Sequence, residues 1–258
     1  MTDKTHLIVS GVARSGTTAL AELLNAHPQV GVGIERYKFR YLRENVYDPG
    51  FFAKERFFDF QPGDTNLRPA ERPAWAPVYD SIAAKWDAAR VIGDKVPDLT
   101  PVLEDFLDAQ PRTRCLYILR NLKDVGLSWQ ARADKPRDRW PKGKDFAAAC
   151  ESWAAQQAQL QALFDSRPEL KDRFLLVDYD RMYAEDTPIE AALLSFLGVD
   201  RAKPFSEMLK RHRGFMAKRA DRKVPPEWVE TYKAIDQTVA RGLRKEARIQ
   251  TARWAAAA

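Results

Sequence analysis

Two glycines near the N-terminus are spaced to hold an anion. Gly11 and Gly16 enclose four residues, and Thr17 and Thr18 follow directly. An apolar run precedes the first glycine and an alanine- and leucine-rich stretch follows the threonines, so the loop joins a predicted strand to a predicted helix. Backbone N–H groups in such a loop point at one anion, and the helix N-terminus adds about half a positive charge. This context favours phosphate binding over an ordinary glycine turn capped by Ser or Thr.

The cation of this loop is not where a triphosphate-binding loop has it. Such loops carry a lysine after the second glycine, where it reaches the β- and γ-phosphates, and a hydroxyl that holds Mg²⁺. Here Thr17 stands at that position and the positive charge lies inside the loop, at Arg14. A guanidinium there can sit beside one phosphate and the group leaving from it. A small kinase or NTPase therefore remains only as an alternative.

Two charged residues follow predicted strands, at the edge where open parallel sheets bind ligands. Glu35 comes after the second strand and is placed to act as a general base. The alternative is a surface carboxylate paired with Arg36 or Lys38. Lys95 follows the third strand beside Pro97, where an ammonium can contact a leaving oxygen or an acceptor, although a lone lysine is usually solvated. Both are candidates for catalysis.

An arginine and a serine are spaced to share a second anion. Arg120 ends the fourth predicted strand, and Ser128 lies eight residues later. If a helix begins near Lys123, bidentate donors from the arginine and the serine hydroxyl can face one phosphate. The alternative for Ser128 is a hydrogen bond to its own helix backbone. Asp124 is interpreted as the helix cap.

Short apolar runs separated by helical stretches predict the elements that position these residues. The predicted strands are His6–Ser10, Val30–Gly33, Ala89–Gly93, Thr113–Leu119 and Arg173–Val177. The predicted helices are Thr17–Ala26, Leu99–Ala109, Val125–Ala133, Asp145–Phe164, Pro188–Leu197 and one from Pro226 toward Arg253. Because the strands lack polar alternation, they indicate a parallel five-stranded sheet with helices on both faces. With the phosphate-binding loop after the first strand, this predicts a doubly wound α/β fold of the P-loop type.

Composition and length predict one domain over residues 1–258, with long irregular insertions at 36–88 and 134–144. The net charge of +6 suits an anionic partner but also fits solvated helix faces. Two isolated cysteines, no apolar run of membrane-spanning length and no room for a signal peptide predict a cytoplasmic protein.

The segment Arg14-Ser15-Gly16-Thr17-Thr18 resembles the 5′-phosphosulfate loop of sulfotransferases that use 3′-phosphoadenosine-5′-phosphosulfate (PAPS). Further matching stretches are His27-Pro28-Gln29-Val30, "VIGDKVPDLT", "CLYILRNLKDVGLSW" and "RFLLVDYDRMYAEDTPIEAALLSFLGV". The resemblance runs from Leu7 to Val199, is nearest to the carbohydrate and heparan-type branch, and departs from the usual pattern where Leu122 replaces a proline.

This resemblance implies PAPS as co-substrate, no metal, and the strand order 2-3-1-4-5. Glu35 would be the base, and Arg14 and Lys95 would stabilise the leaving group. The residues implied to bind PAPS are Ala13, Arg14, Ser15, Gly16, Thr17 and Thr18 for the phosphosulfate, Arg120 and Ser128 for the 3′-phosphate, and Lys218 and Arg219 from a basic tail. Trp129, Tyr179 and Arg222 are weaker candidates. The tail residues also fit a solvated basic run.

The acceptor stays open, with a carbohydrate or another small molecule favoured. Aromatic residues crowd positions 37–60 and predict either a packed subdomain or stacking faces for flat rings. Lys135, Arg137, Arg139 and Lys142 are candidates for steering an anionic acceptor. A basic nucleic-acid-binding domain would explain the charge but not the ordered loop and the arginine–serine pair, so no nucleic acid is expected. A degenerate nucleotide-binding module without turnover is a further alternative, which the presence of Glu35 and Lys95 disfavours.

Overall fold

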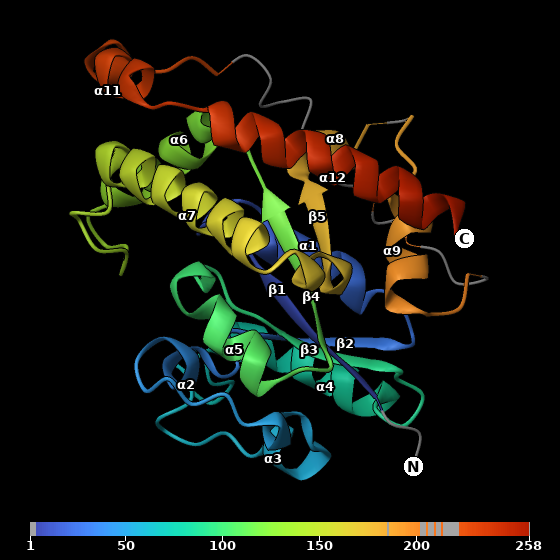
Figure 1. Cartoon of the computed structure of the whole chain (residues 1–258). Coiled ribbons are helices and arrows are strands. Elements are labelled where there is room, and N and C mark those ends of the chain that lie inside the picture. Colours follow the sequence, from blue (N-terminus) through green and yellow to red (C-terminus); the bar gives the residue numbers. More distant parts are fainter. Residues whose placement is uncertain are drawn as a thin grey trace.

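A five-stranded parallel sheet forms the centre of the molecule (Figure 1). The computed structural model describes residues 4–184, 186–201, 205, 209, 213 and 222–257. Its strands are β1 (Thr5–Ser10), β2 (Val30–Ile34), β3 (Val91–Lys95), β4 (Thr113–Leu119) and β5 (Phe174–Asp178). They lie in the order β2-β3-β1-β4-β5, and every pairing is parallel. The five predicted strands and their implied order are confirmed.

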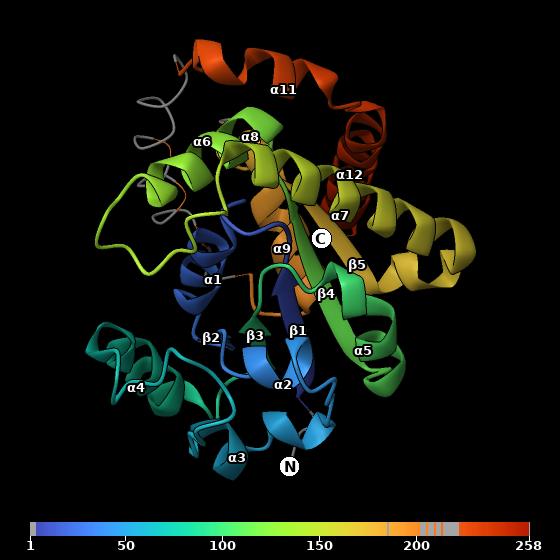
Figure 2. The ribbon, with the colours of Figure 1, turned by 90° about the vertical axis from the view of Figure 1, so that its left-hand side faces the viewer.

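Helices cover both faces of the sheet, as the apolar strands predict. One face packs against α1 (Thr17–Asn25), the short α8 (Tyr179–Met182) and α9 (Ile189–Leu197). The other packs against α5 (Leu103–Ala109), α7 (Phe146–Ser166) and the C-terminal α12 (Thr238–Ala256). Figures 1 and 2 show α7 and α12 on the side of the sheet opposite α1. The carboxyl ends of β1, β2 and β3 are left free to build a site.

The first insertion is less irregular than predicted. Between β2 and β3 it forms α2 (Lys38–Leu42), α3 (Lys54–Phe58), α4 (Ala76–Lys85) and two 3₁₀ turns, Pro49–Phe52 and Pro73–Trp75. Its aromatic residues are mostly buried and packed on one another; the ring centroids of Tyr37 and Phe51 are 4.4 Å apart. The packed-subdomain interpretation is therefore confirmed, because burial of these rings stabilises short helical turns that have little propensity of their own.

Several element boundaries differ from the prediction, and three of the differences have local reasons. The helix α6 (Leu122–Ala133) begins earlier than predicted because Asn121, not Asp124, is its N-cap, accepting from the Asp124 N–H at 2.8 Å. The predicted last helix is broken into Pro226–Trp228, α11 (Val229–Ala234) and α12. Asp236 accepts hydrogen bonds from the N–H and hydroxyl of Thr238 and so starts α12 anew.

The third boundary moves a candidate site residue. β3 runs two residues further than predicted, so Lys95 is the last residue of the strand. Thr100–Val102 is a 3₁₀ turn that precedes α5, where one helix was predicted. The segment 134–144 between α6 and α7 has no helix or strand, as predicted.

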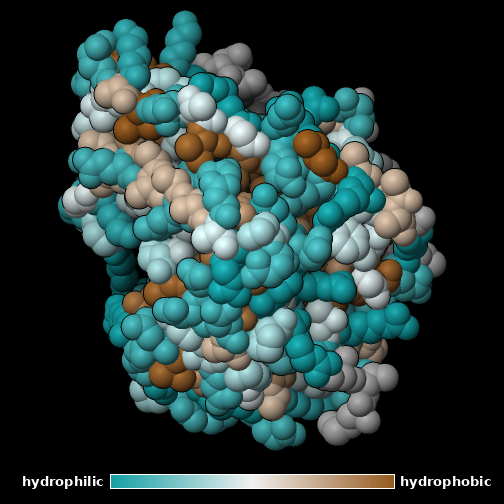
Figure 3. All heavy atoms as spheres, in the orientation of Figure 1, coloured by the Kyte–Doolittle hydropathy of each residue, from teal (hydrophilic) through white to brown (hydrophobic). Residues whose placement is uncertain are grey.

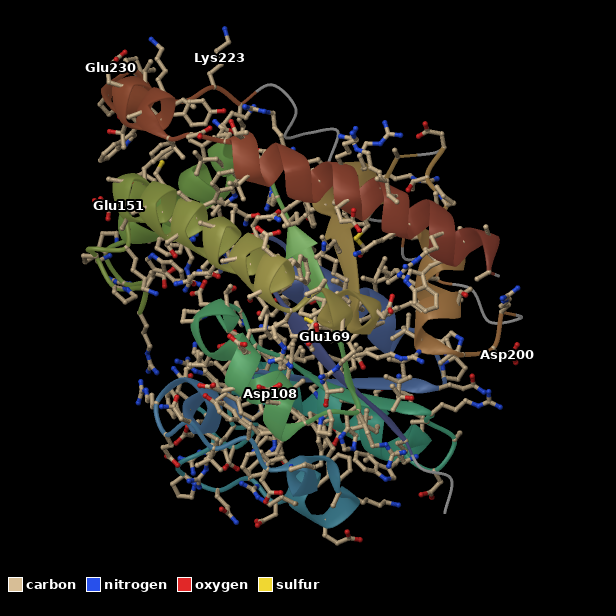
Figure 4. The ribbon with its side chains drawn as sticks, viewed as in Figure 1. Asp108, Glu151, Glu169, Asp200, Lys223 and Glu230 are labelled. Atoms are coloured by element: carbon tan, nitrogen blue, oxygen red, sulfur yellow. The ribbon has the colours of Figure 1, made fainter. Side chains whose placement is uncertain are left out.

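The surface around this core is mostly polar. Figure 3 shows hydrophobic residues in small scattered groups on the face seen in Figure 1. Arg167 pairs with Asp108 and Glu169, which Figure 4 labels on neighbouring parts of that face. Within the described part of the chain, no helix is both long and apolar enough to cross a lipid bilayer. Cys115 and Cys150 are buried and form no disulfide.

Candidate active site

The anion loop between β1 and α1 requires glycine at both ends. Gly11 and Gly16 have φ angles of 142° and 105°, which side chains rarely adopt. A Cβ at Gly16 would lie 2.2 Å from the ring of Tyr179, and one at Gly11 would lie 2.5 Å from the Ile118 carbonyl oxygen. The loop backbone therefore lies tightly on β4 and on the start of α8, with α1 beginning directly behind it.

Buried contacts hold the first half of this loop. The Ala13 N–H donates to Asp98 Oδ1 at 2.7 Å, and the Ala13 carbonyl accepts from Trp129 Nε1 at 2.8 Å. Asp98 also accepts from Gln156 Nε2 at 2.9 Å. Trp129 was only a weak candidate for binding PAPS, and in the structure it positions the loop through its hydrogen bond to the Ala13 carbonyl. Asp98 was missed, although its place just after Pro97 and the third strand is the signal that could have found it.

The loop and the predicted arginine–serine pair adjoin each other. Arg14 Nε donates to Ser128 Oγ at 3.2 Å, and an Arg120 Nη donates to the Arg14 carbonyl at 3.1 Å. The Arg120 guanidinium lies 4.6 Å from the ring centroid of Tyr179 and pairs with Asp124 at 3.2 Å. Its Nε is buried and has no hydrogen-bond partner among the described residues. An unpartnered buried donor beside an anion loop fits a site for a second anionic group.

Glu35 and Lys95 form an ion pair at the carboxyl edge. Lys95 Nζ lies 2.9 Å from Glu35 Oε1, and Lys38 Nζ lies 2.7 Å from Oε2. Burial opposes ionisation of the Glu35 carboxyl, but the two ammonium groups outweigh it and lower its pKa to about 2. Of the two surface partners considered in the alternative reading, Lys38 does pair with Glu35. Arg36 does not, because it is fully buried against Asp64.

A second buried carboxylate fixes the turn that carries Glu35. Asp94 accepts hydrogen bonds from the N–H groups of Arg36 and Tyr37 at 2.8 and 2.9 Å. Burial raises the pKa of Asp94 to about 6, although these two N–H donors oppose the rise. The Arg36 side chain then ties the insertion to this turn through Asp64 at 2.6 Å.

Three residues at this edge adopt the left-handed backbone conformation. Arg14, Glu35 and Asp98 have φ angles of 71°, 52° and 60°, and they follow β1, β2 and β3 respectively. Each such conformation costs on the order of 1 kcal/mol for a residue with a side chain and persists only where the surroundings enforce it. Strained backbone at the ends of three neighbouring strands is typical of functional sites.

These residues line one cavity of about 620 Å³. Ala13, Arg14, Thr17, Thr18, Glu35 and Lys95 all contribute to its wall. Arg120, Ser128, Ser15 and Gly16 do not line it, and the arginine–serine pair adjoins the cavity through Arg14, which contacts both residues. The arrangement can hold an anion at the loop and place a carboxylate and an ammonium beside it.

The other candidates fall into three groups. Lys218 and Arg219 lie outside the described residues. Tyr179 is buried under Arg120, and Arg222 is exposed. Of the four cations predicted to steer an acceptor, only Arg139 lines the cavity; Lys135 and Arg137 line a separate, shallower one.

The parallel sheet and its glycine-bounded loop define an α/β protein of the P-loop type. The sulfotransferase family profile matches residues 7–203, and the chain therefore belongs to the sulfotransferase family. No curated protein matches the sequence at a significant level.

Solved sulfotransferase structures share the fold at low sequence identity. The chain is 16% identical to a sulfotransferase from Alicyclobacillus acidocaldarius, over 98% of this chain and 99% of that one, with a TM-score of 0.55. It is 16% identical to the sulfotransferase domain from the curacin biosynthetic pathway, over 99% and 98%, with a TM-score of 0.50. Mouse SULT7A1 complexed with PAP is 14% identical over 94% and 89%, also with a TM-score of 0.50.

Proposed function

We propose that this sulfotransferase moves the sulfuryl group of PAPS to a hydroxyl or amine of a small acceptor, with a carbohydrate favoured. The observation that carries the proposal is the Glu35–Lys95 pair, 2.9 Å apart, in the same cavity as Arg14, Thr17 and Thr18. A base, a cation and an anion loop are the groups that sulfuryl transfer requires of a protein. A structural neighbour solved with PAP, the product of PAPS, supports the choice of donor.

The donor would bind beside Arg14, with its phosphosulfate at the loop and its 3′-phosphate at Arg120 and Ser128. The N–H groups of Ala13 and Ser15 already donate to Asp98 and to the Val12 carbonyl. The other backbone amides of residues 14–18 and the two threonine hydroxyls would hold the 5′-phosphosulfate. Arg120 and Ser128 would hold the 3′-phosphate, and the unpartnered Nε of Arg120 is a donor available for it. Lys218 and Arg219 remain proposed partners of the nucleotide on the family pattern alone.

The chemistry exchanges one bond at sulfur for another. The acceptor oxygen attacks sulfur in line with the bond to the 5′-phosphate oxygen, that bond breaks, and its electron pair stays on the phosphate. Lys95 and Arg14 stabilise the charge that develops on the leaving oxygen. Glu35 takes the proton of the acceptor, so that PAP and a sulfated acceptor are the products.

The low pKa of Glu35 describes the enzyme without donor. A carboxylate with a pKa of about 2 is a weak base. When Lys95 turns to the leaving oxygen, Glu35 loses the larger of its two charge partners and its pKa rises. Glu35 therefore becomes a stronger base only when the phosphosulfate of the donor is bound.

The proposal is tested with ³⁵S-labelled PAPS and the Glu35→Gln variant. Because the amide cannot accept the acceptor's proton, turnover should fall about 10²–10⁴-fold, the usual contribution of a general base. Binding of PAP, measured by calorimetry, should remain close to that of the parent enzyme.

The matched control is Glu44→Gln, which removes an exposed carboxylate that pairs with Arg40 away from the cavity. It should leave turnover unchanged. Near-normal turnover in Glu35→Gln would exclude this residue as the base, and failure of the parent enzyme to bind PAP would exclude the donor.

A further inference from the structure

The cavity beside Glu35 carries more positive charge than the donor requires. Among the described residues that line it, eight are Lys or Arg and two are acidic, Glu35 and Asp98. The Asp98 carboxylate is occupied by the Ala13 N–H and by Gln156. The Glu35 carboxylate is occupied by Lys95 and by a second ammonium. Neither acid forms an ion pair with the other cations that line the cavity.

Four of the eight cations already have roles. Arg14 and Lys95 serve the donor in the function proposed above. Lys38 pairs with the proposed base at 2.7 Å. Arg132 pairs with Asp138, with its Nε donating to a carboxylate oxygen at 2.8 Å. These four cations account for the donor's phosphosulfate and for the local acids.

The other four cations are Arg43, Arg72, Arg139 and Lys144. Within the described part of the chain, none of their side chains has an ion-pair or hydrogen-bond partner, and two are held only against aromatic rings. The Arg43 guanidinium lies 3.7 Å from the ring centroid of Phe39, and Lys144 Nζ lies 5.2 Å from that of Trp129. Four unpaired cations around one cavity raise its potential and attract an anion.

These cations come from two segments that are far apart in the sequence and both line the cavity. Arg43 and Arg72 belong to the insertion after β2, and Arg139 and Lys144 belong to the segment between α6 and α7. Figure 2 shows this segment and α4 on the same side of the molecule. The 3′-phosphate is proposed to bind the Arg120–Ser128 pair, which does not line the cavity, so the proposed donor site leaves these four cations to another anion.

Apolar side chains, three of them aromatic, line the cavity together with the cations. Phe39, Leu42, Trp75 and Trp140 line the same cavity. Both tryptophans are half-buried, so each leaves part of its ring accessible. Aromatic faces beside unpaired cations are suited to a ring that carries a negative charge.

We propose that the acceptor is itself an anion, a hydroxylated ring compound with a carboxylate, sulfate or phosphate that Arg43, Arg72, Arg139 and Lys144 bind. This inference rests on the proposed function and names the class of its second substrate. Glu35 does not repel such an acceptor, because Lys38 stays paired with it when Lys95 turns to the donor.

The test compares each carboxylate acceptor with its uncharged ester. The aromatic pair is 4-hydroxyphenylacetate and its methyl ester, and the sugar pair is methyl glucuronide and its methyl ester. With ³⁵S-labelled PAPS, the carboxylate member of at least one pair should have the higher kcat/KM, and the pair that responds tells an aromatic acid from an acidic sugar.

Variants of two cavity arginines test whether the preference for a carboxylate acceptor arises in the cavity. Arg72→Gln and Arg139→Gln should each raise KM for the carboxylate acceptor about tenfold, since one charge-assisted contact is lost, and should change KM for the neutral partner less than about twofold. Arg137→Gln is the matched control: it lies two residues from Arg139, lines a different cavity and should change neither KM.

The outcomes separate this proposal from the one on which it rests. Failure to bind PAP rejects the sulfuryl-transfer proposal. An enzyme that binds PAP but shows no preference for the carboxylate member of either pair, including one that uses neither pair, overturns the anionic-acceptor proposal. Equal effects of Arg137→Gln and Arg139→Gln also overturn it, because they would reflect net charge and not binding in the cavity.

Discussion

The position of Glu35 between two cations depends on its own backbone as much as on the two ion pairs. Its N–H donates to the Lys95 carbonyl at 2.8 Å, and its left-handed φ of 52° turns the chain sharply after β2. Asp94, the neighbour of Lys95 on β3, holds the next two N–H groups of that turn. The strand end and the ion pair therefore position the same side chain.

Ionised Glu35 should stabilise the fold in a defined pH range. Because folding lowers its pKa from 4.5 to about 2, its contribution is present above about pH 5 and is lost as the pH falls toward 2. The shift corresponds to about 3 kcal/mol. We expect the free energy of unfolding, from urea titrations between pH 6 and pH 3, to fall more steeply for the parent protein than for Glu35→Gln.

Glu44→Gln again serves as the control, and its pH dependence should follow that of the parent. Parallel curves for the parent and Glu35→Gln would mean that the ion pair with Lys95 does not persist in solution.

Arg120→Ala should distinguish the contribution of the 3′-phosphate to binding from that of the 5′-phosphate. If Arg120 binds the 3′-phosphate, affinity for PAP should fall about tenfold or more, since a hydrogen bond to a charged group is lost. Affinity for adenosine 5′-phosphate, which lacks that phosphate, should change much less. Calorimetry with both ligands checks this. Equal losses for the two ligands would show that Arg120 acts only by supporting the Arg14 carbonyl.

At the scale of elements, the site depends on how β1, α6 and α7 meet beneath the anion loop. Val12 and Ala13 pack in a small cluster with Trp129, Phe146 and Trp153. Both tryptophans donate to carbonyls of the site, Trp129 to that of Ala13 and Trp153 to that of Arg120. The loop is therefore fixed by a helix that lies 116 residues later in the sequence. The end of β4 is fixed by a helix that lies 33 residues later.

Gly16→Ala tests the close approach of the loop to α8. The added Cβ would meet the Tyr179 ring at 2.2 Å, and Arg120 stacks on that ring. Overpacking of this kind costs about 1–3 kcal/mol. We expect a lower midpoint of urea unfolding and weaker PAP binding.

The control is Gly198→Ala, at a glycine whose φ is also positive, 67°, but whose Cβ would meet nothing within 4 Å. It should lose only the backbone term, on the order of 1 kcal/mol, and keep PAP affinity. If both variants lost the same stability and affinity, the contact with Tyr179 would have no part in the site.

At the scale of the molecule, the last helix packs mainly on β5, α7 and α9. Leu243 and Ala247 of α12 belong to the same buried cluster as Ile8 of β1 and Tyr117 of β4. This shared cluster of N-terminal and C-terminal elements supports the proposal that the chain forms one domain.

Ligand stabilisation distinguishes the sulfotransferase site from a kinase site. A ligand at a hundred times its Kd adds about 2.7 kcal/mol to folding stability. PAP should therefore raise the melting temperature, whereas ATP with Mg²⁺ should raise it much less, because Thr17 replaces the lysine of a triphosphate loop. Thermal-shift measurements with adenosine as the reference check this. A larger shift with Mg²⁺ and ATP would favour the kinase alternative.

The sequence by itself determined the strands, the anion loop and the candidates at the strand ends. Apolar runs specify buried strands, and glycine spacing specifies the loop, because both depend on neighbours along the chain. Glu35 and Lys95 were found in this way, each at or just after the end of a strand.

Only the tertiary structure decided which of these groups meet. The register that pairs Ile34 with Lys95 brings Glu35 to its partner across sixty residues, and no local pattern encodes that register. The same holds for Asp98 under the loop and for the contact of Arg14 with Ser128. Side-chain contacts between distant segments depend on how the whole core packs, and the unpaired cations of the cavity become visible only when those contacts are known.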